Sequence, residues 1–260
     1  MTENRDNSLA RFTRQVAFDG LGLAGQKALA TGRALIVGVG GLGSWAAELL
    51  ARAGVGFLRL VDGDRVDLTN IHRQALYDEA DAAGGLPKVE AAAGHLRRIN
   101  SQVVVEPVVA RVDHRNIESL AADAHVLIDG TDNFAARFLL NDYAVKAGVP
   151  WVFAGCVRAE WQTMTIVPGR SACLRCVLEG PPPACTDPNC RQVGVLGPAV
   201  AAVAAFQAAE AVKVLIGRLD LVNPHLLKFD FWSNGLQRIQ AQRRPDCRCC
   251  GHHEFEFLEP

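Results

Sequence analysis

The chain contains 260 residues, of which 49% are hydrophobic and 21% are charged, and this composition excludes an intrinsically disordered protein. Its formal net charge of −1 at pH 7 excludes the overall basic field that many nucleic-acid-binding proteins carry. We read no apolar stretch of about 18 residues that would span a membrane, and no targeting signal in the opening residues MTENRDNSLARF. A cytoplasmic protein is therefore expected, with neither a membrane nor a nucleic acid as partner.

Strand-like and helix-like patterns alternate from residue 11 to about residue 160. The pattern predicts helices at 11–29, 44–54, 87–100, 116–124 and 134–148, and strands at 34–39, 57–64, 103–110, 125–133 and 150–156. Regular alternation of this kind is typical of a parallel sheet covered by helices on both faces. The fold class predicted is therefore a Rossmann-like α/β fold.

The pattern changes after about residue 161. A strand-like segment at 161–169 precedes a proline-rich loop at 180–189, an alanine-rich helix at 198–217 and a strand-like segment at 226–234. We expect this part to extend the same sheet with antiparallel strands rather than to form an independent domain.

A glycine-rich turn lies between the strand at 34–39 and the helix at 44–54. Gly38, Gly40 and Gly43 fit the G-x-G-x-x-G pattern, whose glycines allow a tight turn and a close approach of backbone to phosphate. Asp62 follows about 20 residues later, where a carboxylate binds ribose hydroxyls. The sequence therefore predicts a nucleotide on this turn, and an NAD-linked oxidoreductase is the usual first interpretation.

Three polar clusters favour phosphate chemistry over hydride transfer. Asn70 and Arg73 follow the second strand, and Lys88 lies in the first turn of a helix, where the helix dipole disfavours a cation. Asp132 and Asn133 follow the fourth strand, and either could be a helix cap. Asp132 could instead bind Mg²⁺, which prefers one or two carboxylates together with phosphate oxygens. Two cations and a magnesium ion would neutralise the charge on a leaving pyrophosphate.

Cysteine spacing gives the most specific signal. Eight cysteines are unusual as disulfides in a reducing compartment, so metal ligation or thiol chemistry is expected. Cys173 with Cys176 and Cys247 with Cys250 form two C-x-x-C pairs that match a structural Cys₄ zinc site, which would staple the C-terminal region. Cys249 could replace a neighbouring ligand, and redox-active pairs stay open as an alternative.

Taken together, these residues resemble the ThiF/MoeB/HesA adenylyltransferases, relatives of the ubiquitin-activating enzymes, and are closest to the ThiF branch. The resemblance covers nearly the whole chain through the motifs RFTRQ, GVGGLG, DGDRVDLTNIHRQ, GLPKVEAA, DGTDN, the paired C-x-x-C and NCRQVGVLGP. It implies that ATP and Mg²⁺ activate the C-terminal glycine carboxylate of a small ubiquitin-like sulfur carrier, ThiS-like or MoaD-like and ending in Gly-Gly. The product would be an acyl-adenylate for later sulfur transfer in thiamine or molybdopterin biosynthesis.

The resemblance also implies the role of each matching residue. Arg73, Lys88 and Asp132 would be catalytic, with Asp132 as the Mg²⁺ ligand. The zinc ligands would be Cys173, Cys176, Cys247 and Cys250. The ATP-binding residues would be Gly38, Gly40, Gly41, Gly43, Asp62, Asn70, Arg73, Gln74, Lys88, Asp132 and Asn133, joined by Arg14.

Two further implications concern the partner subunit and the later sulfur chemistry. Arg14 would reach into the partner subunit's nucleotide site, which implies a homodimer. Cys190 would be a further catalytic residue, because it resembles a crossover-loop cysteine that can bond to the activated carrier or to persulfide sulfur, and a bystander role stays open. Sulfur itself would come from a separate donor.

These assignments divide the chain within one adenylation domain over residues 1–260. An N-terminal helical segment would occupy 1–30, a nucleotide-binding core 31–160, and a carrier-binding and zinc-binding part 161–260. Two other functions stay open. A non-catalytic scaffold would bind a ubiquitin-like partner without consuming ATP, and an NAD-dependent oxidoreductase would leave Arg73 and Asp132 without a role.

Overall fold

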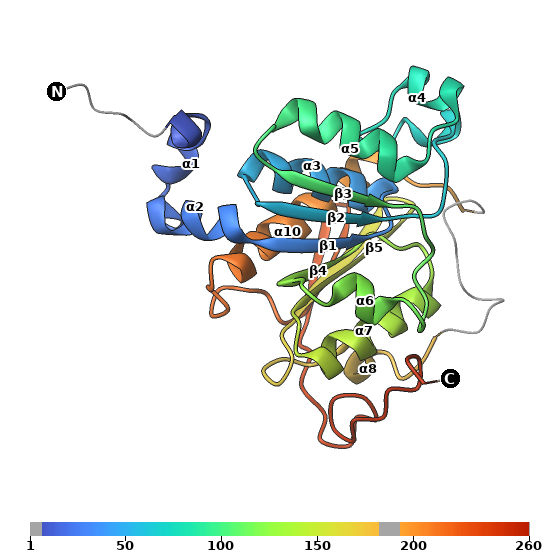
Figure 1. Cartoon of the computed structure of the whole chain (residues 1–260). Coiled ribbons are helices and arrows are strands. Elements are labelled where there is room, and N and C mark those ends of the chain that lie inside the picture. The colour runs from blue at the N-terminus through green and yellow to red at the C-terminus, as the bar shows by residue number, and fades with distance from the viewer. Residues whose placement is uncertain (1–6, 182–192, 260) are drawn as a thin grey trace.

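One eight-stranded sheet forms the centre of the computed structural model, which describes residues 7–181 and 193–259 (Figure 1). Its strand order is β3-β2-β1-β4-β5-β6-β7-β8. The first five strands pair in parallel and the last three in antiparallel fashion. The strands are β1 (Arg33–Val37), β2 (Phe57–Val61), β3 (Val104–Val108), β4 (Val126–Asp129), β5 (Trp151–Val157), β6 (Glu160–Ile166), β7 (Leu226–Asp230) and β8 (Gly235–Ile239). The predicted mixed sheet of the Rossmann-like class is confirmed.

Helices cover both faces of the sheet, and alternate residues of each parallel strand divide between two cores. In β1, Ala34 and Ile36 pack with α3, α5 and α10, whereas Leu35 and Val37 pack with α6, α7 and the cysteine-rich C-terminal region. The helices are η1 (Asn7–Phe12), α1 (Thr13–Val16), α2 (Gly22–Thr31), α3 (Gly41–Ala53), η2 (Leu68–Asn70), α4 (Glu79–Gly84), α5 (Lys88–Ile99), α6 (Ile117–Ala121), α7 (Phe134–Ala147), α8 (Leu174–Val177) and α10 (Gly197–Leu215).

The helix α10 corrects one expectation from the sequence. By length and composition alone it could cross a membrane, although no such stretch was expected. In the fold it lies against α3, β5 and β6, and residues such as Val203 and Ala208 are buried. It is therefore a core helix, with an apolar composition that follows from burial between the sheet and α3.

Three other differences have local causes. The predicted helix at 11–29 is interrupted between α1 and α2, and α2 begins at Gly22, which takes the left-handed backbone that glycine allows (φ 61°). Pro87 is the N-cap of α5 and not part of its first turn. The strand β8 was not predicted, because all five of its residues are exposed and show no apolar alternation.

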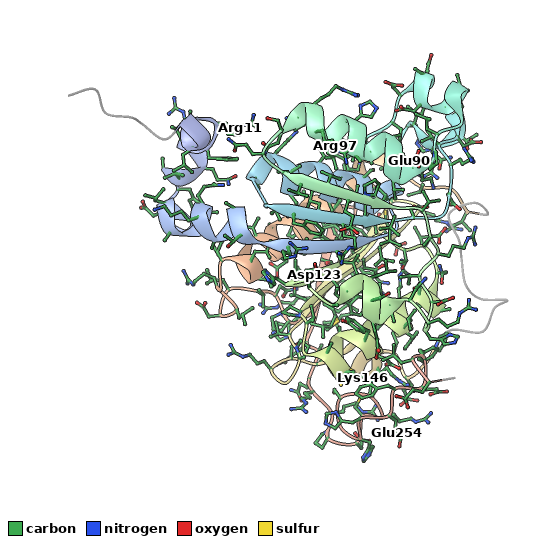
Figure 2. All side chains as sticks on the ribbon, viewed as in Figure 1. Arg11, Glu90, Arg97, Asp123, Lys146 and Glu254 are labelled. Atoms are coloured by element: carbon green, nitrogen blue, oxygen red, sulfur yellow. The ribbon has the colours of Figure 1, made fainter. Side chains whose placement is uncertain are left out.

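Two ion pairs tie β1 and β2 to Asp123, away from the carboxyl ends of the strands, where ligands of open α/β sheets bind. Asp123, labelled in Figure 2, pairs with Arg33 at the start of β1 and with Arg59 of β2. The N-terminal segment also lies away from these carboxyl ends, since α2 leads directly into β1 (Figure 1). Phe12 and Gln15 anchor this segment, since Phe12 is buried and Gln15 donates a hydrogen bond to the carbonyl oxygen of Ala53.

Candidate functional site

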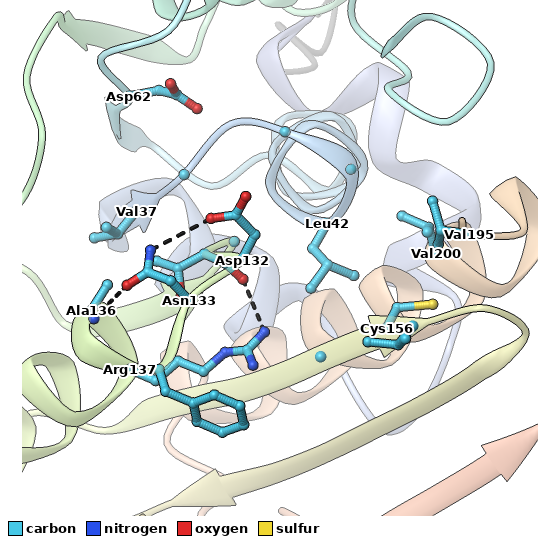
Figure 3. Close-up of a pocket in the computed structure, with 18 of the residues that line it drawn as sticks. Val37, Leu42, Asp62, Asp132, Asn133, Ala136, Arg137, Cys156, Val195 and Val200 are labelled. Carbon is cyan, nitrogen blue, oxygen red and sulfur yellow. Dashed lines mark hydrogen bonds between the residues drawn. The ribbon is translucent and has the colours of Figure 1, made fainter. Parts of the chain in front are cut away.

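A cleft of about 2020 Å³ opens at the carboxyl ends of β1, β2 and β4 and continues over β5, β6 and β7. Ligands of open α/β sheets bind at this edge, outside the strand ends. Figure 3 shows its centre, with the glycine turn and Asp62 on one side and Cys156 of β5 on the other. Of the predicted ATP-binding residues, all but Gly43 and Arg14 line the cleft within the described part of the chain.

Each of three glycines in the turn has a different structural role. Gly38 has a φ of 82°, and a Cβ atom there would lie 2.6 Å from the carbonyl oxygen of Gly130. A Cβ atom at Gly43 would lie 1.8 Å from the carbonyl oxygen of Gly38, so this glycine lets α3 approach the turn. At Gly40 the nearest atom to such a Cβ would be Nε2 of Gln74, at 3.7 Å. Gly40 therefore presents bare backbone to the cleft.

The side chain of Asp62 is fixed at the end of β2. One carboxylate oxygen accepts a hydrogen bond from the N–H of Val39 and the other from the N–H of Asp64, both at 2.8 Å. Each oxygen has a further lone pair, so the carboxylate can also accept a ribose hydroxyl. The glycine turn thus fixes Asp62 with acceptor capacity to spare, and its role as a ribose ligand stays a prediction.

The segment after β2 carries Asn70, Arg73 and Gln74 along one wall of the cleft. The amide nitrogen of Gln74 donates to Oδ1 of Asn70 at 2.7 Å. Nη1 of Arg73 donates to the carbonyl oxygen of Thr69 and lies 2.9 Å from Nε2 of His72. Asp67 caps this segment, and its hydrogen bonds with Thr69 lower the pKa of the Asp67 carboxyl. Arg73 thus lines the cleft from an ordered turn.

The side chain of Lys88 is almost fully buried at the start of α5 and forms an ion pair with a residue that sequence reasoning missed. Its Nζ lies 3.3 Å from Oδ2 of Asp64, whose other oxygen lies 3.2 Å from Nη2 of the exposed Arg111. Both Asp64 and Arg111 line the cleft. Asp64 could have been predicted as a site residue, because it is the second carboxylate of the DGD motif. Arg111 could not, because an exposed arginine after β3 matches no motif.

The β4–α7 loop separates the two roles that the sequence left open for Asp132 and Asn133. Oδ1 of Asn133 accepts a hydrogen bond from the N–H of Ala136 at 2.9 Å, so Asn133 is the N-cap of α7. Asp132 is exposed in the cleft, and within the described residues its side chain accepts a hydrogen bond only from Nδ2 of Asn133, at 3.5 Å (Figure 3). An accessible carboxylate beside a nucleotide turn fits the ligand preference of Mg²⁺.

Beneath this loop, Asp129 and Arg137 form a buried pair. Asp129 is fully buried, and its Oδ1 accepts hydrogen bonds from the N–H and the hydroxyl of Thr131. Burial raises the pKa of the Asp129 carboxyl, and the nearby Arg137 opposes this shift. Arg137 was not singled out from the sequence, because an arginine inside a helical pattern carries no signal of its own.

The four predicted zinc ligands come together. The sulfurs of Cys173, Cys176, Cys247 and Cys250 all lie within 4.8 Å of one another. Three of the pairs lie 3.4, 3.6 and 3.9 Å apart. Tetrahedral zinc with Zn–S bonds of about 2.3 Å places its sulfurs roughly 3.8 Å apart, so this donor set fits zinc.

Cys249 does not belong to this cluster. Its sulfur accepts a hydrogen bond from Nδ2 of Asn141 at 3.3 Å on the side of α7. The C-terminal segment is attached to the same helix, since the N–H of Phe257 donates to Oδ2 of Asp142 and Lys146 pairs with Glu259. The four-sulfur cluster therefore lies where the last part of the chain packs against α7 and α8.

Arg14 and Gly43 are the predicted ATP-binding residues in the described part of the chain that do not line the cleft. Arg14 is exposed beside its anchored neighbours Phe12 and Gln15, and it does not line the cleft of its own chain. Cys190 lies outside the described residues, so its predicted role is not addressed by the structure.

Comparison with known proteins places this site in a family. The sequence model described as ThiF family matches residues 12–249. The chain is 41% identical over 250 residues to the sulfur carrier protein ThiS adenylyltransferase of Bacillus subtilis, covering 95% of the chain and 73% of that protein. It is 37% identical to the molybdopterin-synthase adenylyltransferase of Escherichia coli, covering 96% and 100% respectively.

Longer relatives and solved structures are also similar. An adenylyltransferase and sulfurtransferase of Sus scrofa is 42% identical, and the aligned region covers 94% of this chain and 54% of that protein. The crystal structure of E. coli MccB with ATP superposes with a TM-score of 0.82 at 23% identity, covering 93% of this chain and 74% of the other, and supports the fold. From the family match and the identity to these adenylyltransferases, we conclude that the chain belongs to the ThiF family.

Proposed function

We propose that this chain is an ATP-dependent adenylyltransferase that activates the C-terminal glycine carboxylate of a small ubiquitin-like sulfur carrier. The observation that carries this proposal is the cleft, where the glycine turn, Asp62, the cations Arg73 and Lys88 and the accessible carboxylate of Asp132 lie together. Its relatives are named as adenylyltransferases of ThiS and of molybdopterin synthase. We assign the carrier to the ThiS or MoaD type, and the pathway to thiamine or molybdopterin biosynthesis.

The proposed reaction brings two anions together, the carrier carboxylate and the triphosphate of ATP. A carboxylate oxygen of the carrier attacks the α-phosphorus of ATP, the bond from that phosphorus to the bridging oxygen breaks, and pyrophosphate leaves. Arg73 and Lys88 reduce the repulsion between the two anions and stabilise the charge on the leaving group. No general base is required, because the carrier carboxylate is already ionised at neutral pH. Binding of the folded carrier supplies the orientation of its tail.

Asp132 is the residue we assign to Mg²⁺. Its exposure and its lack of strong protein partners in the described residues support this assignment. When bound, the ion supplies charge neutralisation at the phosphate oxygens. We assign Zn²⁺ to the four-cysteine cluster as a structural ion, since four thiolates leave no open position for substrate.

A homodimer completes this proposal. Arg14 lies on the anchored N-terminal segment at the opposite end of the strands from the cleft, so its side chain is available to a second subunit. We assign Arg14 to the nucleotide site of the partner subunit. A cytoplasmic location, a separate sulfur donor and covalent chemistry at Cys190 stay predictions of the sequence.

The direct test is ATP–pyrophosphate exchange with Mg²⁺ and with a ThiS-type or MoaD-type carrier ending in Gly-Gly. Exchange that requires both a carrier and Asp132 supports the enzyme, and the carrier that works identifies the pathway. Asp132→Asn is compared with Asp220→Asn, which changes an exposed aspartate paired with Arg218 outside the cleft. Carrier binding without exchange would favour the scaffold, and NAD(H) binding without exchange would favour the oxidoreductase.

A further inference from the structure

The guanidinium of Arg137 is held in the wall of the cleft by contacts from two strands and one loop. Arg137 extends from the start of α7 beneath the loop that carries Asp132 (Figure 3), and only 8% of the residue is exposed. Its Nη2 donates a hydrogen bond to the carbonyl oxygen of Thr131 at 3.0 Å, and its Nε lies 3.6 Å from Oδ2 of Asp129. The charge is therefore retained inside the fold by a carboxylate.

Neighbouring residues restrict this side chain further. The guanidinium carbon lies 5.2 Å from the ring centre of Phe134 and 5.5 Å from that of Phe153. At Gly155 of β5 a Cβ atom would lie 3.2 Å from Nη2, so the absence of a side chain there leaves room for the guanidinium. A side chain positioned in this way loses little conformational entropy when it binds a ligand.

Much of the hydrogen-bonding capacity of Arg137 is unused. A guanidinium has five N–H donors, and the described residues accept a hydrogen bond only from Nη2. Nε and Oδ2 of Asp129 are both buried without a hydrogen bond, since 3.6 Å is too long for one. Arg137 also lines the cleft. Donors thus remain for an anion that enters from the cleft.

The position of Arg137 relative to the sheet indicates which anion can reach its remaining N–H donors. Arg73 and Lys88 follow β2, on the side of the glycine turn and Asp62, whereas Arg137 follows β4 and touches β5. Beyond β5 the cleft continues over β6 and β7, lined by residues such as Trp161 and Lys228. A nucleotide on the glycine turn occupies the first half, so a second substrate must enter along the second half and meet Arg137.

We propose that Arg137 binds the C-terminal carboxylate of the carrier and orients it toward the α-phosphate. This inference rests on the proposed adenylyltransferase function. A planar guanidinium suits the task, because two parallel N–H groups can bind both oxygens of a carboxylate. Asp129 has a supporting role, since it holds the cation in place when the cleft is empty.

The test is a binding cycle with four measurements by calorimetry, without nucleotide. A ThiS-type carrier ending in Gly-Gly is compared with the same carrier bearing a C-terminal carboxamide, on the wild-type enzyme and on Arg137→Gln. The wild type should bind the carboxylate form about 10- to 100-fold more tightly than the carboxamide, as a charge-assisted hydrogen-bonded pair requires. In Arg137→Gln this ratio should fall to about 3-fold or less.

Two matched variants keep the result interpretable. Asp129→Asn/Arg137→Gln removes both charges, so no buried carboxylate loses its partner, and it should show the same small ratio. Arg175→Gln changes an arginine that is equally buried but outside the cleft, and it should keep the wild-type ratio. An unchanged ratio in both Arg137 variants of an exchange-competent enzyme overturns this inference alone. A wild-type enzyme that binds no carrier and shows no exchange overturns the proposed function with it.

Discussion

An added methyl group should affect two glycines of the same turn differently. At Gly43 it should lower the stability of the fold, and at Gly40 it should lower the affinity for ATP. In Gly43→Ala the new Cβ would lie 1.8 Å from the carbonyl oxygen of Gly38, roughly 1.5 Å inside a C···O contact of about 3.3 Å. Backbone atoms cannot rotate away, so α3 must shift from β1. In Gly40→Ala the nearest atom is the end of the Gln74 side chain at 3.7 Å, an ordinary contact. The first change should therefore disturb the fold and the second should not.

The expected magnitudes differ enough to measure. Overpacking of this severity should cost Gly43→Ala about 3 kcal/mol or more of unfolding free energy. At about 2 °C per kcal/mol for a chain of this size, its Tm should fall by about 6 °C. Gly40→Ala should stay within about 1 kcal/mol of wild type. Its methyl group occupies the approach of phosphate to backbone N–H groups, so ATP affinity should fall about 30-fold, the equivalent of one charge-assisted hydrogen bond.

Calorimetric unfolding and ATP titration of the two variants, each with Mg²⁺, separate these effects. A Gly43→Ala protein with the wild-type Tm would contradict the packing role assigned to this glycine. A Gly40→Ala protein that loses as much stability as Gly43→Ala, or that binds ATP as wild type does, would contradict the phosphate-facing role of Gly40.

Three further predictions concern the magnesium ligand, the cysteine cluster and the dimer. Asp132→Asn should reduce ATP–pyrophosphate exchange by about 100-fold with an unchanged Tm, and normal exchange would refute its role. Cys250→Ser should lower the zinc content measured by plasma emission and lower the Tm, whereas an equal zinc content would exclude this cysteine as a ligand. Arg14→Ala and Asp132→Asn subunits, each inactive alone, should regain about a quarter of wild-type exchange after mixing and refolding, because half of the dimers then contain one intact composite site. Absence of any recovery would refute the shared site.

The sequence was informative where a function depends on local spacing. Gly38, Gly40 and Gly43 could be read together with Asp62 because a strand, a tight turn and a helix follow one another in a fixed order. The four cysteines could be paired because each C-x-x-C motif places two sulfurs on one turn. Such signals do not depend on how distant segments pack.

Features that depend on tertiary contacts could not be read in this way. Arg137 looks like any arginine of a helix until β4 and β5 are placed beside it, and Asp64 acquires its partners Lys88 and Arg111 only in the folded chain. The helix α10 has the composition of a membrane span because it is buried between sheet and helix. In each of these cases the surroundings, and not the residue type, determine the role.

The most direct test of the central proposal is intact-mass spectrometry of the carrier after incubation with the enzyme, ATP and Mg²⁺. We predict that a Gly-Gly carrier gains the mass of one adenylyl group, that pyrophosphate appears in equal amount, and that Asp132→Asn forms neither product. A carrier that binds the folded enzyme but keeps its original mass, with ATP unconsumed, would contradict acyl-adenylate formation.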